Sequence, residues 1–260
     1  MNEFPENTKV VGIIKTELRD PILIQGLPGL GFVGKVSVDY LVEKLKPIKI
    51  AELYSSYLTL PDGNLGINVE LNGSFSLPKY EFYACTETTP NLVLLTGNAQ
   101  PNPLGQYEVA EAVLDYASSL DCKTVIAIGG YGVRLPQEVG TVYAIASDSG
   151  IVEKLTRHGA QMSKGGLIVG ACGVVLGLCA QKNMQCVGLL GATRGMHPDI
   201  QAARAVIHLI AKAYNLPIEL KELDDEAADI KAKMDHLTRM QAELFRRRPE
   251  EKKKEDRYII

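Results

Sequence analysis

The sequence predicts an α/β fold, a three-layer sandwich in which helices cover both faces of a mostly parallel β-sheet. Apolar runs of strand length alternate with segments of helical period from residue 10 to residue 220, and this alternation is typical of parallel strands joined by crossover helices. Of the 260 residues, 46% are hydrophobic and 23% are charged, which suits a globular chain with a sizeable core. Heptad spacing after residue 220 adds a predicted C-terminal helical tail.

The first half of the chain carries strand patterns and two helix patterns. They run in the order strand 10–14, strand 22–24, helix 32–45, strand 48–53, hairpin or meander 64–85, strand 92–96 and helix 104–120. The hairpin region alternates only loosely and is divided by Gly73 and Pro78, which favours turns between short strands. In the second predicted helix the apolar residues recur on one face, as in an amphipathic helix that packs on a core.

The second half continues the alternation. Its order is strand 124–128, strand 142–146, helix 150–158, helix 170–180, strand 187–191 and helix 198–214. The run Gly129-Gly130-Tyr131-Gly132 is expected to end the strand before it. The helix over 170–180 is apolar nearly all round and is therefore predicted to be buried. Pro198 near the first turn and Asn215 after the last turn mark the ends of the final helix.

Charge and cysteine content argue against several classes of protein. The net charge is −3 and the basic residues near the C-terminus alternate with acidic ones, so no nucleic-acid partner is expected. No apolar run reaches the ~18 residues of a membrane span, and residues 1–8 do not resemble a signal peptide, so the expected location is the cytoplasm. Cysteines in apolar segments, at spacings that match no zinc site, predict buried thiols and no metal. They are Cys85, Cys122, Cys172, Cys179 and Cys186.

The C-terminal region is predicted to form two further parts after a domain over 1–220: an amphipathic helix over 221–248 and a charged tail over 249–260. Apolar positions of the helix recur alternately four and three residues apart, the spacing of a coiled-coil seam. They include Leu223, Ile230, Met234, Leu237 and Leu244. Such a helix either joins copies of the chain into an oligomer or packs on its own domain, and the pattern supports both equally.

Gly29, Gly31 and Gly34 spell G-x-G-x-x-G between a predicted strand and a predicted helix. Glu52 closes the following strand, near the position of a ribose-binding acid in dinucleotide-binding folds. The intervening loop residues are mostly apolar, however, and glycines that permit a tight turn and a close helix–strand approach explain the same pattern. We favour this structural interpretation and expect no cofactor.

Three further residues are candidates for the same cleft because they follow predicted strands. Asn98 follows strand 92–96, and Arg194 and His197 follow strand 187–191; ligands of α/β proteins bind at such strand ends. Arg194 and His197 precede a helix and could bind an anion there. No nucleophile stands beside a base and no two carboxylates are paired, so the sequence predicts a cleft but no reaction.

Four segments together resemble the archaeal members of the proteasome assembly chaperone family, in the branch related to the eukaryotic proteasome assembly chaperone two. They are the glycine loop over 26–34, Thr-Gly-Asn-Ala-Gln-Pro over 96–101, Ile-Gly-Gly-Tyr-Gly over 128–132 and Leu-Gly-Ala-Thr over 190–193. The resemblance covers roughly residues 8–220. It implies a fold akin to nucleoside phosphorylases without their active-site chemistry, self-association, and binding to the α-subunits of the 20S proteasome.

Such chaperones commonly end in a hydrophobic residue, a tyrosine and any residue, and this end enters pockets between α-subunits. This sequence ends Arg257-Tyr258-Ile259-Ile260, so the tyrosine stands one place early and Arg257 replaces the hydrophobic residue. Apolar residues beyond a polar tether either fold back onto their own domain or are offered to a partner. We expect Tyr258, Ile259 and Ile260 to bind the proteasome.

The predicted function is therefore a non-enzymatic, cytoplasmic and homo-oligomeric proteasome assembly chaperone or α-ring-binding protein. One alternative is an enzyme or sensor that binds a nucleotide or nucleoside at the glycine-rich cleft; a base or acid facing the loop would favour it. The other is a scaffold whose tail helices only hold an oligomer together. A scaffold would need the seam of the helix over 221–248 but not the last three residues.

Overall fold

A computed structural model describes residues 8–60, 62–69, 71–135, 138–163, 165–195 and 198–225. The chain divides after Leu220 into two units, and each is described by itself. Of the second unit the structure describes only residues 221–225, which are helical and include Leu223. The remaining predicted seam residues, Ile230, Met234, Leu237 and Leu244, lie outside the described residues, as does the end of the tail.

The first unit contains strands and helices in alternation. Up to residue 101 they are β1 (Lys9–Gly12), β2 (Ile22–Gly26), a 3-10 turn (Leu30–Phe32), α1 (Val33–Leu45), β3 (Ile48–Tyr54), β4 (Leu58–Thr59), β5 (Asn68–Val69), β6 (Phe75–Ser76), β7 (Tyr80–Cys85), β8 (Leu92–Gly97) and β9 (Gln100–Pro101). After residue 101 they are α2 (Gln106–Ser119), β10 (Thr124–Gly132), β11 (Val142–Ala146), α3 (Ser149–Arg157), β12 (Gln161–Met162), α4 (Gly170–Gln181), β13 (Gln185–Thr193) and α5 (Ile200–Tyr214).

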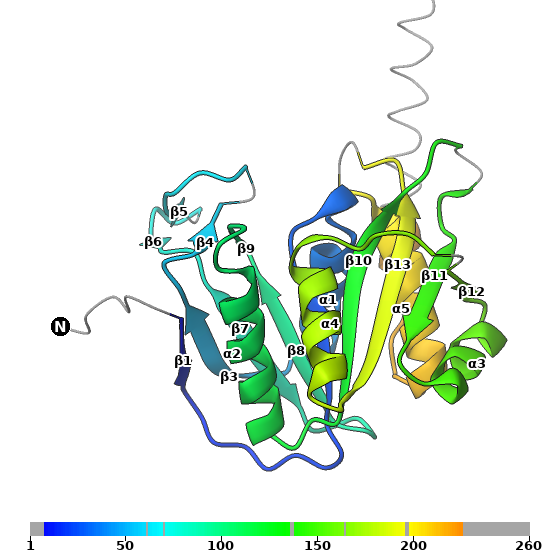
Figure 1. Ribbon diagram of the computed structural model, residues 1–260, viewed down its shortest axis with the longest axis horizontal. Coiled ribbons are helices and arrows are strands. Elements are labelled where there is room, and N and C mark those ends of the chain that lie inside the picture. The colour runs from blue at the N-terminus through cyan, green and yellow to red at the C-terminus, as the bar shows by residue number, and fades with distance from the viewer. Residues whose placement is uncertain are drawn as a thin grey trace, which may run out of the picture. The chain divides into compact units, whose positions relative to one another are not determined.

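A mixed nine-stranded sheet in the order β1-β3-β7-β8-β2-β10-β13-β11-β12 forms the middle layer (Figure 1). Its four central strands, β8, β2, β10 and β13, are parallel, whereas β1, β3 and β7 on one side and β11 on the other join it antiparallel. The central strands β2 and β8 are buried along their whole length, as expected where both faces of a sheet are covered. The predicted α/β fold is confirmed.

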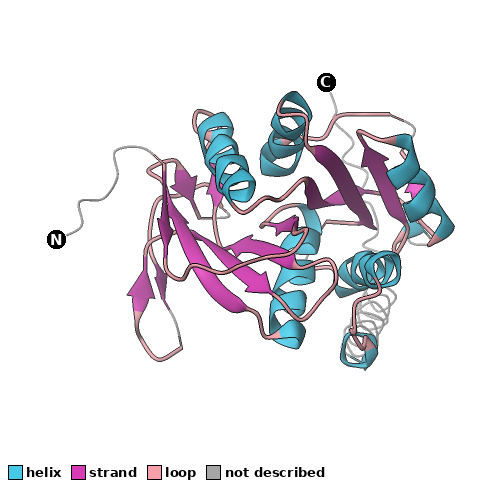
Figure 2. Ribbon diagram, turned by 90° about the horizontal axis from the view of Figure 1, so that it is seen from below, coloured by secondary structure: helices cyan, strands magenta, loops and turns pink. Residues whose placement is uncertain are grey.

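Helices cover the two faces in pairs, which makes three layers (Figures 1 and 2). α1 packs beside α5 on one face, and α2 packs beside α4 on the other. Successive strand residues point to opposite faces, so Leu23 joins the core beneath α2 and α4, with Leu114 and Val175, while Ile24 is buried on the opposite face. Apolar residues on both faces of the central strands therefore contribute to two cores, one on each side of the sheet.

Several predicted element ends are wrong. The strand expected to stop at Ile128 continues through the glycine run to Gly132, because each of these residues pairs with β13 up to Thr193. The last helix begins at Ile200 rather than at Pro198, since the side chain of Asp199 caps it by accepting a hydrogen bond from the Ala202 N–H. Asn215 closes that helix, as predicted, and it adopts the left-handed conformation there.

The described residues also bear on the expectations from composition. All five cysteines are free, and four of them are buried. Within the described ranges no group of three His, Cys, Asp or Glu side chains could hold a metal ion. No helix in the described part of the chain is long and apolar enough to cross a bilayer.

Candidate functional site

The glycine loop joins the buried end of β2 to α1 through a short 3-10 turn. Gly31 and Phe32 both adopt left-handed backbone conformations, with φ of 61° and 51°. Glycine reaches this region without strain, whereas a bulky residue such as phenylalanine rarely adopts it. The Phe32 N–H donates to the Gly29 carbonyl oxygen at 2.8 Å, which closes the turn on itself.

The glycines of this loop are used for close packing of protein on protein. A β-carbon on Gly34 would lie 2.5 Å from the carbonyl oxygen of Ile128, and one on Gly31 would lie 2.5 Å from the hydroxyl oxygen of Thr193. A β-carbon on Gly130 would meet the Leu30 carbonyl oxygen. Missing side chains therefore let α1 and its preceding turn lie directly on β10 and β13, the structural role favoured from the sequence.

The order of the strands also places Glu52, the acid that a dinucleotide site would need, away from the glycine loop. Glu52 lies on β3, and two strands, β7 and β8, separate β3 from the glycine-bearing β2. In the doubly wound dinucleotide-binding folds the ribose-binding acid belongs to the same βαβ unit as the glycine loop. Here the Glu52 carboxylate instead pairs with Lys79 at 2.5 Å and Lys49 at 2.9 Å.

A cavity of about 630 Å³, the apolar cleft, opens between the glycine loop, the ends of β2 and β10 and the start of α4. Gly29 and Gly34 line it, together with apolar side chains and residues 129–132. Its polar side chains include Gln25 and Gln100, and Gln100 donates a hydrogen bond to the Pro28 carbonyl oxygen. Burial raises the pKa of the Cys172 thiol in its wall to about 12, so this thiol is protonated and a poor nucleophile.

The other candidate residues that the structure describes do not line this cleft. Gly31 packs against Thr193 and does not line it, and Asn98 lines a separate cavity on the opposite side of the sheet end. Arg194 follows β13 directly and is exposed. His197 lies outside the described residues. Of the residues expected to share one cleft, Gly29 and Gly34 thus line this cavity and Asn98 lines the other, since successive residues at a strand end face opposite sides of the sheet.

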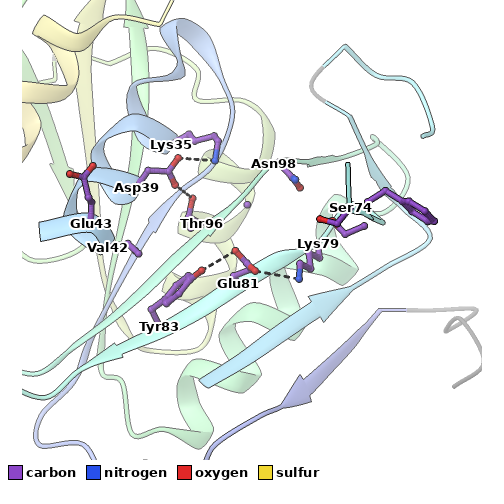
Figure 3. Close-up of a pocket in the computed structure, with 13 residues that line it drawn as sticks. Lys35, Asp39, Val42, Glu43, Ser74, Lys79, Glu81, Tyr83, Thr96 and Asn98 are labelled. Atoms are coloured by element: carbon purple, nitrogen blue, oxygen red, sulfur yellow. Dashed lines mark hydrogen bonds and ion pairs between the residues drawn. The ribbon is translucent and has the colours of Figure 1, made fainter. Parts of the chain in front are cut away.

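The second cavity, the charged pocket, has a volume of about 540 Å³ and lies between α1, the β5–β6 ribbon and the ends of β7 and β8 (Figure 3). On its α1 wall, Asp39 accepts a hydrogen bond from the Thr96 hydroxyl at 2.6 Å and pairs with Lys35 at 2.8 Å. Opposite, Glu81 pairs with Lys79 and accepts a hydrogen bond from the Tyr83 hydroxyl at 3.0 Å.

Two lysines and two glutamates form a closed ion-pair network, of which Lys79 and Glu81 line this pocket. Glu52 and Glu81 are direct cross-strand neighbours on β3 and β7, an arrangement of like charges that is unfavourable by itself. Lys49 bridges both carboxylates at 2.9 and 2.7 Å, and Lys79 bridges both at 2.5 and 3.3 Å. Each of the four charges therefore pairs with two charges of opposite sign.

The charges of this network set the protonation of Glu52 and of Tyr83, which donates a hydrogen bond to Glu81. Although burial opposes the charged form, hydrogen bonds from Lys79, Tyr54 and Lys49 lower the pKa of Glu52 to about 2. Burial and the Glu81 charge raise the pKa of Tyr83 to about 12. A carboxylate that stays ionised and a phenol that stays protonated at neutral pH are poor proton-transfer groups, because general catalysis favours a pKa near the working pH.

The sequence analysis missed the charged pocket. Its lining residues come from α1, the β5–β6 ribbon, β7 and the end of β8, and only the tertiary structure brings them together. The alternation of Lys79, Glu81 and Tyr83 with buried apolar residues does indicate one polar strand face. That pattern does not reveal that Lys49 and Glu52 lie opposite.

Comparison with known proteins places this geometry in a family. Residues 23–238 match the PAC2 family, and the chain belongs to that family. The solved structure of Pyrococcus furiosus PbaB, described as an archaeal proteasome activator, superposes with a TM-score of 0.82 at 30% identity, over 90% of this chain and 100% of that one. P. furiosus PbaA, described as an archaeal homolog of proteasome-assembly chaperone, gives a TM-score of 0.75 at 23% identity over 92% and 95%.

A curated relative extends the similarity to a second archaeal genus. Protein MJ1210 of Methanocaldococcus jannaschii is 31% identical over 231 residues, which is 88% of this chain and 87% of that protein. The resemblance proposed from the four segments is therefore confirmed across the whole sandwich. The matched region stops at residue 238, before the charged tail begins.

Proposed function

We propose that this chain is a non-enzymatic, cytoplasmic protein that binds the α-ring of the 20S proteasome, as an assembly chaperone or as a ring-binding regulator. One observation carries the proposal: the likeness to PbaB, a proteasome activator, spans 90% of this chain and all of that one at 30% identity. Identity at this level over the full fold supports a shared class of partner more than the fold alone does.

The chemistry of both cavities supports a binding role over a catalytic one. The apolar cleft is lined largely by apolar side chains and glycine peptide groups, and its thiol is held protonated by burial. In the charged pocket every lysine of the network is neutralised by two glutamates. Nucleophilic catalysis needs an activated nucleophile beside a base. The Thr96 hydroxyl of the charged pocket does donate to the Asp39 carboxylate, but Thr96 is buried and Asp39 also pairs with Lys35.

We place the proteasome contact in the last three residues, Tyr258, Ile259 and Ile260. The segment before them is mostly charged and without periodicity, which suits a tether. Each apolar side chain that leaves water on binding contributes roughly 1.5–3 kcal/mol before ordering costs. An oligomer that presents several tails to one ring would add avidity if two tails engage together.

A binding assay on immobilised proteasome α-rings tests the tail. Deleting residues 258–260 should weaken binding at least tenfold, and Tyr258→Ala should do much of the same. Replacing Glu250 and Glu251 with serine changes the tether but not the apolar end, so this control should bind as the parent does. Undiminished binding after the deletion would move the contact to the folded domain.

The register of the tail can be tested separately. Removing Ile260 alone makes Tyr258 the penultimate residue, as in the ending that the family resemblance implies. This truncation should keep or improve binding if the protein docks in that register. It should lose binding if the protein uses a register of its own.

Homo-oligomerisation belongs to the same proposal, through the seam that includes Ile230 and Leu237. Replacing both with aspartate puts charge into an apolar contact and should cost several kcal/mol of association. Lys233→Asp with Arg239→Asp adds the same two carboxylates off the seam and serves as the control. Light scattering that finds both variants equal in mass to the parent would contradict this role of the seam.

A further inference from the structure

The β5–β6 ribbon exposes an apolar face to solvent. Val69 and Phe75 are cross-strand partners and therefore point to the same side, and both are largely exposed, at 66% and 72%. Leu65 is exposed at 78% and Leu71 at 110%, the most exposed large apolar side chain of the described residues. An isolated two-stranded ribbon is at best marginally stable in water, so an apolar face on one is expected to be covered by a partner.

The tip of this ribbon is held in a defined shape. The side chain of Asn72 accepts hydrogen bonds from the Ser74 N–H at 2.9 Å and from the Ser74 hydroxyl at 2.7 Å. Gly73 takes the positive φ of 83° that the turn requires. Leu71 therefore projects from an ordered turn, which lowers the entropy cost of inserting it into a pocket.

The apolar cleft has the complementary shape and an apolar rim. Leu167 and Val169 in its wall are exposed at 94% and 81%, and Leu30 at 47%. A cavity of about 630 Å³ falls in the range of about 300–1,000 Å³ in which drug-sized ligands bind, so it has room for more than one side chain. An exposed apolar rim of this extent suits a protein partner better than a small ligand.

Charge on the two surfaces is opposite. Residues 62–77 include Asp62 and, next to Leu71 in the sequence, Glu70, but no lysine or arginine. Beside the cleft the Val133 N–H donates to the Thr193 carbonyl oxygen, and the residue after each of these two is an arginine, Arg134 and Arg194. Both arginines are exposed, and neither forms a salt bridge with another of the described residues.

We propose that the β5–β6 ribbon of one copy inserts Leu71 and its apolar neighbours into the apolar cleft of a second copy, with Asp62 facing Arg134 and Arg194. The occupant is the same chain, because the two surfaces match in apolar character and in sign of charge. A protruding apolar patch that fits a pocket elsewhere on the same molecule makes a head-to-tail contact, which closes into a ring or extends as a fibre. This contact is independent of the tail that carries the proposed function.

A cross-linking experiment on the full chain tests the contact directly. The donor chain carries a photoreactive benzophenone amino acid at position 71, and the receiver chain is isotopically heavy, so that mass spectrometry separates links between copies from links within one. Links should join position 71 of the donor to cleft peptides of the receiver, residues 27–34 or 167–172. Links to residues 65–77 of the receiver, links only within one chain, or a monomeric full-length protein would each overturn the proposal.

Receiver variants make the test quantitative. Leu167→Asp with Val169→Asp, and separately Arg134→Glu with Arg194→Glu, should each lower the yield of these links at least tenfold. A donor with Asp62→Arg should restore the yield with the second receiver. Ile48→Asp is the matched control, since Ile48 is exposed at 53% at the start of β3, outside both surfaces, and the yield should not change. If the charge exchange did not restore the links, the proposed pairing of the donor's Asp62 with the receiver arginines would be overturned.

The variant positions are exposed, so they should fold as the parent does, and melting curves check this. Deleting residues 258–260 should leave the cross-link yield unchanged while it weakens proteasome binding. If deleting residues 258–260 abolished the links, position 71 would not mark a contact separate from the tail. That result would overturn the proposal and leave the tail hypothesis in place.

Discussion

The backbone N–H of Asp199 donates to the carbonyl oxygen of Gly31 at 2.8 Å, which fastens the start of α5 to the glycine loop before α1. The side chain of Asp199 accepts from the Ala202 N–H at 3.0 Å and from the Thr193 hydroxyl at 2.6 Å. Thr193 is also the residue against which Gly31 packs. One aspartate thus ties together two helices and the end of β13, and these hydrogen bonds hold the glycine loop in its shape.

Replacing Asp199 with alanine should destabilise the fold by about 2 kcal/mol, the upper end for loss of a helix N-cap, because a charge-assisted bond to Thr193 is lost as well. Asp148→Ala is the matched control: the Asp148 side chain caps α3 at 3.1 Å but is exposed, and among the described residues it makes only that hydrogen bond. Loss of the Asp148 cap should lower the free energy of unfolding by about 0.5–1 kcal/mol. Denaturant titration measures both, and equal losses would contradict the role given to Thr193.

Gly34→Ala should destabilise the protein by about 1–3 kcal/mol, the usual cost of overpacking, since the new methyl group would lie 2.5 Å from the Ile128 carbonyl oxygen. Neither backbone can move away without disturbing α1 or β10.

Gly177→Ala provides the contrast for Gly34. Gly177 lies inside α4, is exposed, and has nothing within 4 Å of its missing β-carbon. Alanine there should stabilise by about 0.5–1 kcal/mol through helix propensity. Thermal melting of both variants checks the pair, and a Gly34→Ala protein as stable as the parent would contradict the close-packing role of the loop.

Stability should depend on Glu52 in a defined pH window. The pKa of Glu52 lies at about 2 in the folded protein, below its ordinary value of 4.5, so its contribution is fully present above pH 4.5 and is lost as the pH falls toward 2. Glu52→Gln should therefore cost about 1 kcal/mol at pH 7, the upper range for a partly exposed pair. The difference from the parent should shrink below pH 4.5.

Glu153→Gln is the control for this pH dependence. Glu153 pairs with Arg157 at 3.0 Å, but both side chains are mostly exposed, at 69% and 75%. Such pairs contribute little, so this variant should track the parent from pH 7 to pH 2. Urea midpoints measured across the range compare all three proteins, and a pH-independent effect of Glu52→Gln would show that the loss is one of packing.

Nucleotides should not stabilise the protein, because the glycines contact protein and Glu52 stands two strands away from them. A ligand at a hundred times its dissociation constant adds about 2.7 kcal/mol to the stability, which a thermal shift assay detects readily. Micromolar NAD, NADP and ATP should leave the melting temperature unchanged. A saturable rise with any of them would instead favour an enzyme or sensor built on the apolar cleft.

Much of the fold was predictable because its causes are local. The periodicity of apolar residues predicted most of the strands and helices of the sheet, and Asn215 marked the end of α5 where the structure has it. The predictions failed where the structure of a segment depends on the strand with which it pairs. The glycine run after Ile128 looked like a loop and is a strand, because its partner β13 supplies the pairing. The short β4 and β9 strands exist only because they pair with each other.

The sequence by itself determined the fold class, the order of the elements and the family of this protein, since propensity, periodicity and motif order are written along the chain. Only the tertiary structure decided what the motifs contact. Sheet order moved Glu52 away from the glycine loop, and register placed it beside Glu81 between two lysines. Packing left the apolar face of the β5–β6 ribbon uncovered. Such contacts join residues far apart in the chain, and their free energy depends on which strands become neighbours rather than on any local pattern.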